Sequence, residues 1–103
     1  MKTRSQIQLN YRQAMNQADR LDAIAANVER IAGQDMESSM RKLSNGWKGE
    51  NASAFLMKES VLQGEISRTA KNIRSIATDI RTVARLVYHA EMEVVQIAER
   101  RES

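Results

Sequence analysis

The chain has 103 residues, enough for one domain, and its 42% hydrophobic and 28% charged residues are ordinary for a soluble protein. A net charge of +3 is too small to indicate a nucleic-acid partner, and the absence of cysteine excludes disulfides and thiolate metal sites. No apolar run resembles a cleaved signal peptide or a membrane-spanning helix. Proline is absent and only 4 residues are glycine, so the composition predicts an all-α fold.

The first half of the chain carries a heptad pattern of apolar and small residues in alternating steps of four and three. Its members are Ile7, Tyr11, Ala14, Ala18, Leu21, Ala25, Val28 and Ala32. This spacing predicts a helix over about residues 5–43 with one seam against a partner helix. Past Gly33 the register loosens, and Met36, Met40 and Leu43 continue the apolar face. Gly33 indicates a kink, a close helix approach or a tolerated surface glycine.

A second, longer heptad pattern fills the other half. Its members are Ala52, Phe55, Glu59, Leu62, Ile66, Thr69, Ile73, Ile76, Ile80, Val83, Val87, Ala90 and Val94. It predicts a helix over about residues 51–98, with Asn51 as its N-cap and a charged tail that frays after residue 98.

Between the two patterns, residues 44–50 have the composition of a turn. Gly46 and Gly49 bracket Trp47, the only tryptophan, and Gly49 suits a backbone with positive φ. The prediction for residues 1–103 is therefore a single domain, a hairpin of two long antiparallel helices.

A lone hairpin leaves apolar surface in contact with water. We expect this spare surface at Ile24, Ile31, Leu56, Ala70, Ala77 and Ala84. Exposed apolar surface of this extent marks an interface, and two hairpins side by side form a four-helix bundle. We therefore expect a dimer, with a second copy or a related hairpin. The residues predicted to form the hairpin and dimer interface are Leu21, Val28, Ile66, Ile73, Ile76, Ile80 and Val83.

The sequence offers little for catalysis. His89 is the only histidine, and no paired carboxylates or phosphate-binding glycine loop accompany it. The prediction is a non-enzymatic protein with no metal, cofactor or small-molecule substrate.

Five basic residues recur on the second helix, away from its seam, and no aromatic residue interleaves with them. They are Arg68, Lys71, Arg74, Arg81 and Arg85. This strip reads as a solvated outer face or as a footprint for nucleic acid or an acidic partner.

Trp47-Lys48-Gly49 at the midpoint of a heptad hairpin resembles the WXG family of small type VII secretion substrates, the ESAT-like proteins. The resemblance covers the whole length. It implies dimeric four-helix bundles, exported folded from the cytoplasm by a membrane ATPase without a cleaved signal peptide. It also implies a role as a substrate or as an escort for a larger toxin. Trp47 and Gly49 match the turn positions of the family.

One part of the family pattern is altered. The family's export signal is a tyrosine followed four residues later by an acid, near the end of the second helix. Tyr88 is well placed, but its fourth neighbour is Met92, with Glu91 and Glu93 on either side. The resemblance thus implies an altered signal or a signal completed by a partner chain. The alternatives are an adaptor coiled-coil hairpin unrelated to secretion, or a basic nucleic-acid-binding bundle.

Overall fold

The computed structural model describes residues 2–46 and 49–102, and their regular structure is entirely helical. The elements are α1 (Arg4–Arg30), the π-helical turn η1 (Ile31–Asp35), α2 (Met36–Gly46) and α3 (Glu50–Glu102). The predicted all-α class is confirmed. Trp47 and Lys48 of the predicted turn lie outside the described residues.

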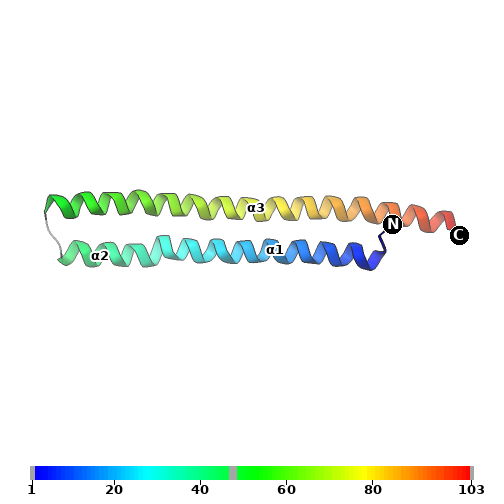
Figure 1. Cartoon of the computed structure of the whole chain (residues 1–103), viewed down its shortest axis with the longest axis horizontal. Helices are drawn as coiled ribbons and strands as arrows, with labels where there is room; N and C mark the ends of the chain where they lie inside the picture. Colours follow the sequence, from blue (N-terminus) through cyan, green and yellow to red (C-terminus); the bar gives the residue numbers. More distant parts are fainter. Residues whose placement is uncertain (1, 47–48, 103) are drawn as a thin grey trace. The chain divides into compact units, whose positions relative to one another are not determined.

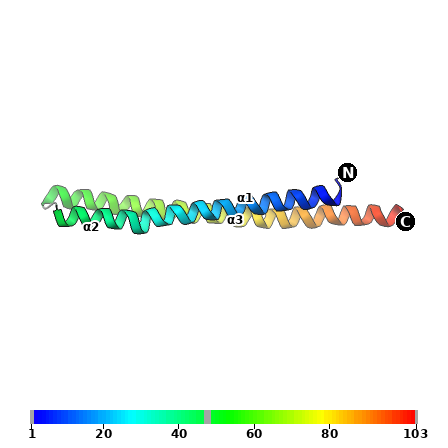
Figure 2. The same cartoon turned by 90° about the horizontal axis from the view of Figure 1, so that it is seen from below.

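The contacts divide the chain into two units, and each unit is an antiparallel helix pair. One unit joins Met1–Leu21 with Ser75–Ser103, so the beginning of α1 lies beside the end of α3. The other unit is Asp22–Arg74, in which the end of α1, η1 and α2 lie beside the beginning of α3. Figures 1 and 2 show the first arm running antiparallel to α3 within each unit, as the hairpin prediction requires.

Both long helices begin with a defined cap, and the cap of α3 differs from the predicted Asn51. Gly49 has a φ of 121°, and its carbonyl accepts the Ser53 amide at 3.1 Å, so Gly49 and not Asn51 precedes the first turn of α3. At the start of α1, Thr3 and Gln6 form a reciprocal capping box. The Gln6 amide donates to Thr3 Oγ1 at 3.2 Å, and the Thr3 amide donates to Gln6 Oε1 at 2.9 Å.

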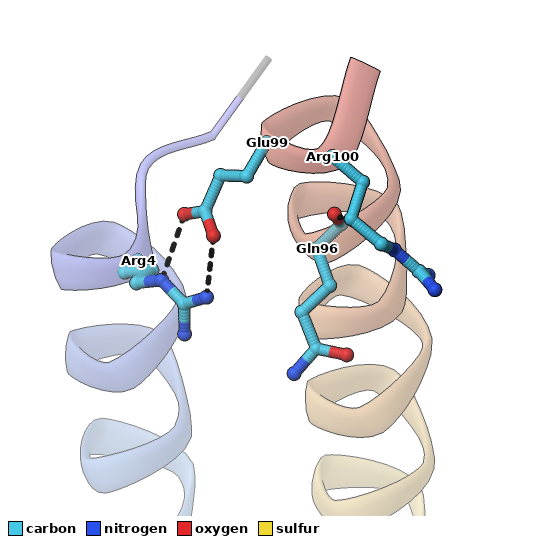
Figure 3. Close-up of polar contacts among 4 residues, drawn as sticks. All are labelled: Arg4, Gln96, Glu99 and Arg100. Atoms are coloured by element: carbon cyan, nitrogen blue, oxygen red, sulfur yellow. Dashed lines mark hydrogen bonds and ion pairs between the residues drawn. The ribbon is translucent and has the colours of Figure 1, made fainter. Parts of the chain in front are cut away.

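α3 is helical as far as Glu102, beyond the predicted helix end at about residue 98. Arg100 and Arg101 lie in the last turn, where cations interact favourably with the helix dipole. The Arg100 side chain also donates from Nε to the Gln96 carbonyl at 3.4 Å (Figure 3). Both effects favour the helical form of this charged segment.

The loosened register after Ala32 has a structural cause, the π-helical turn η1. The Met36 amide donates to the Ile31 carbonyl, five residues back, so the turn holds one extra residue. An unbroken heptad would bring Asp35 into the seam, but the shift brings Met36 there instead. The Gln63 side-chain amide donates to the Ala32 carbonyl from α3. A Cβ on Gly33 would meet no atom within 4 Å, so the structure does not support a close approach there.

Two glycines should respond oppositely to alanine. A Cβ at the exposed Gly64 meets nothing within 4 Å, so Gly64→Ala should raise the free energy of unfolding by about 0.5–1 kcal/mol. Gly49→Ala should lower it by roughly 1–3 kcal/mol, because an alanine is strained at a φ of 121°. Urea unfolding followed by circular dichroism measures both changes. Equal effects of the two substitutions would contradict the assignment of Gly49 as the strained cap.

Candidate protein-interaction site

Alanine makes up most of the buried seam of the helix pairs. Of the nine buried hydrophobic residues that the structure describes, six are Ala18, Ala25, Ala32, Ala52, Ala70 and Ala77. Small side chains let two helix backbones approach closely. The predicted α1 seam is confirmed, since all eight of its members are buried or half-buried.

On α3 the seam keeps one of the two predicted rows, which includes Ile66, Ile73 and Ile80, and uses the alanine row in place of the other. Ala70 and Ala77 were predicted as spare surface but are fully buried, and Leu56 and Ala84 are half-buried. The residues of the neighbouring row, by contrast, lie outside the seam, as Ile76 shows at 50% exposed. The reason is that the apolar stripe of α3 is three rows wide. Its alanine row matches the alanines of α1, and the bulkier row is left outside.

The predicted interface residues therefore divide into two sets. Half-buried beside the alanines are Leu21, Val28, Ile66, Ile73 and Ile80. Ile76 and Val83 are half-exposed and free of the seam. Only the first set can stabilise the hairpin itself, and the second set remains accessible to a partner.

One set of exposed large side chains lies on a single side of the seam within each unit. When the alanine rows are labelled a in the heptad a–g, this set falls at position g, whereas others, such as Met57 and Leu86, lie on the outer faces. The members of the set are Ile24 and Ile31 of α1, and Phe55, Leu62, Ile76 and Val83 of α3, and together we term them the apolar side. In an antiparallel pair the g positions of both helices flank the same side of the seam. Each unit therefore presents an apolar side, with exposures of 41–57%.

A groove in the first unit supports this geometry. It has a volume of about 280 Å³, and both Asn10, at position g of α1, and Val83, at position g of α3, line it. Ile80 and Val87 add apolar walls, and Glu91 lies at its edge. The g positions of the two arms thus share one groove.

The opposite side of the seam carries ion pairs. Arg74 donates from Nε to Glu29 Oε1 at 2.7 Å, and both residues occupy position e. Arg81 donates to Asp19 at 2.8 Å. The Arg74 hydrogen bond holds the pKa of Glu29 below its usual value, against a smaller opposing effect of desolvation. Two of the five cations predicted to lie away from the seam therefore bridge the two arms.

Further ion pairs join the two ends of the chain. Arg4 donates to both carboxylate oxygens of Glu99, at 2.9 and 2.8 Å (Figure 3). This hydrogen bond lowers the pKa of Glu99 and raises that of Arg4. Lys2 contacts Glu91 at 3.0 Å. Exposed pairs of this kind add little stability.

The altered tyrosine motif lies within the packed end of the hairpin. Tyr88 packs against a cluster of Ile7, Met92 and Val95. Met92 is only 9% exposed, so an acid at this position would be placed against the apolar cluster. Of the flanking acids, Glu91 is paired with Lys2 and Glu93 is exposed.

Among the described residues, no group of three or more histidine, cysteine, aspartate or glutamate side chains is arranged to hold a metal ion. Nor does any described helix have the length and apolarity that crossing a membrane requires. Comparison with protein-family models, with curated proteins and with solved structures finds no match.

The alanine seam can be tested by enlarging one member. Ala77 is fully buried, so Ala77→Leu should lower the free energy of unfolding by about 1–3 kcal/mol through overpacking. Ala23→Leu, at an exposed position on the outer face of α1, is the matched control and should be nearly neutral. Denaturant titration measures both. A neutral Ala77→Leu would show that the arms do not approach closely at this row.

Proposed function

We propose that this chain is a non-enzymatic WXG-type hairpin that dimerises through its apolar side into a four-helix bundle. In this role it is a substrate of type VII secretion or the helical escort of a larger effector. The observation that carries the dimer is an inversion of the usual burial order, because the hairpin buries alanines and leaves large aliphatic side chains half-exposed.

The energetics favour a partner on the apolar side. Full burial of a large aliphatic or aromatic side chain is worth about 1.5–3 kcal/mol. The six residues of the apolar side are each about half-exposed, so several kcal/mol of hydrophobic stabilisation remain to be gained. Contiguous exposed apolar surface of this kind is typical of an interface.

The partner that fits best is another helical hairpin. The exposed side chains of α3 recur at seven-residue intervals from Phe55 to Leu62, and again from Ile76 to Val83. A heptad-spaced row is complementary to another helix that carries the same spacing. A second copy of the chain or a related hairpin meets this requirement.

The export role rests on the family resemblance. Trp47-Lys48-Gly49 lies between α2 and α3 in the sequence, and the positive φ of Gly49 gives a physical reason for a glycine at the third position of the motif. We infer that a membrane ATPase of the type VII system recognises the dimer in the cytoplasm. A partner chain then supplies the acid that the Tyr88 motif lacks.

The sequence leaves two other functions open. An adaptor hairpin unrelated to secretion would use the same apolar side, so an export assay must separate it from the proposal. A nucleic-acid-binding bundle is disfavoured because Arg74 and Arg81 already neutralise carboxylates of α1.

The dimer is tested at Ile76. Because Ile76 lies outside the hairpin seam, Ile76→Asp should leave the alanine rows packed but bury an unpaired carboxylate in the dimer interface. Light scattering should show a dimer for the unaltered chain and a monomer for the variant. Val61→Asp, at a 61% exposed outer position, is the control and should stay dimeric. A dimeric, fully helical Ile76→Asp would contradict the interface.

Export is tested in the source cells. The chain should be present in the culture supernatant of unaltered cells and absent from that of cells lacking the secretion ATPase. Trp47→Ala should reduce the secreted amount without changing the cytoplasmic amount. A cytoplasmic marker enzyme controls for lysis. Secretion at the same level without the ATPase would leave only the adaptor function standing.

A further inference from the structure

A second groove lies on the charged side of the first unit, and we propose that it binds a carboxylate from an acidic segment of a third protein. It has a volume of about 360 Å³, and six residues from the two arms line it. These are Gln8, Tyr11, Arg12, Arg85, Tyr88 and His89. The inference rests on the proposed function and extends it, because it specifies the chemistry of a partner beyond the dimer.

The charge of the groove is not neutralised within the hairpin. Arg12 and Arg85 have no hydrogen bond or ion pair with any of the residues that the structure describes. By contrast, Arg4 and Arg81 in the same unit each pair with an acid of the opposite arm. Two guanidinium groups without a counterion on the walls of one groove favour an anionic occupant.

The remaining walls are aromatic. The ring centroids of Tyr11 and Tyr88 lie 4.9 Å apart at an angle of 44°, and His89 meets Tyr88 edge-on at 5.4 Å. Tyrosine rings provide an apolar surface beside a polar rim. An occupant that pairs a carboxylate with an adjacent apolar side chain would therefore use both the guanidinium groups and the rings.

The composition of this side favours an acidic peptide over nucleic acid. Binding to a phosphate backbone usually engages about 6–10 phosphates. Here only two unpaired cations line the groove, since the nearby Arg81 is engaged by Asp19. Two guanidinium groups match one or two carboxylates, each of which can accept a bidentate hydrogen-bond pair.

A second copy of the chain is not the expected occupant. The proposed dimer uses position g of both arms, whereas Gln8 and Tyr88 of the groove lie at position e, on the opposite side of the seam. Dimerisation through the apolar side would thus leave the groove accessible. The occupant is accordingly a third chain, such as a cargo protein or a component of the export machinery.

The experiment uses the full-length isotope-labelled chain and a capped tetrapeptide of leucine, two glutamates and leucine. Titration should shift the ring resonances of Tyr11, Tyr88 and His89 in NMR spectra. Replacing Arg12 and Arg85 by glutamine should weaken binding by about tenfold or more. Replacing Arg68 and Lys71 by glutamine removes the same charge elsewhere on α3 and should have little effect. A glutamine version of the peptide should not bind.

Three outcomes would overturn the inference. The peptide does not shift the ring resonances, both double variants weaken binding equally, or a decathymidine oligonucleotide binds at the groove more tightly than the peptide. The last outcome would assign the groove to nucleic acid. Peptide binding by a monomeric Ile76→Asp variant would show that the groove does not require the dimer. If the peptide binds while light scattering shows the unaltered chain to be a monomer, the dimer proposal fails and the groove stands.

Discussion

The close packing of alanine against alanine is the constraint on which the rest of this hairpin depends. Ala18, Ala25 and Ala32 repeat every seven residues on the first arm, and Ala70 and Ala77 repeat in the same way on α3. Once these rows face each other, every other position is fixed on one side of the seam or the other. Position e meets position e, where the ion pair of Glu29 and Arg74 forms. Position g meets position g, where large apolar side chains remain exposed.

The π-helical turn extends this logic to the part of the hairpin near the bend. Its extra residue rotates α2, so that Met36, Met40 and Leu43 are less exposed than their neighbours. Without the rotation, Asp35 would occupy the seam. The turn disturbs the regular hydrogen-bond pattern of the helix, and the Gln63 amide offsets this by donating to the Ala32 carbonyl. A single cross-arm hydrogen bond thus accompanies the change from alanine packing to methionine packing.

The sequence predicted the two helical arms because each has a strong heptad periodicity, and it predicted the α1 seam because one unbroken series of steps of four and three runs along that arm. It did not predict which row of α3 faces α1, since that stripe is three rows wide and periodicity favours all three equally. One signal in the sequence could have identified the row. The seven-residue spacing of Ala18, Ala25 and Ala32 is the same as that of the α3 alanines. The capping box at Thr3 and Gln6 was also readable as a local pattern. The charged groove could not be predicted from the sequence, because Tyr11 and Arg85 come from different arms and meet only through tertiary packing.

The two sides of the seam have different requirements, and this difference gives the hairpin its expected division of roles. The large side chains of the apolar side are not buried within one chain, because no described segment covers them. Hydrophobic contacts are non-directional, so the heptad spacing of these side chains is what favours a helical partner. The charged side is largely satisfied from within by pairs such as Arg81 with Asp19. It leaves Arg12 and Arg85 without an ion pair to any described residue beside Tyr88. Since Tyr11 and Tyr88 line the grooves on both sides, the same ring pair borders the surface proposed for the dimer and the one proposed for a carboxylate. Packing on the apolar side would therefore restrict the rings that wall the charged groove, which physically links assembly of the bundle to recognition of an acidic partner.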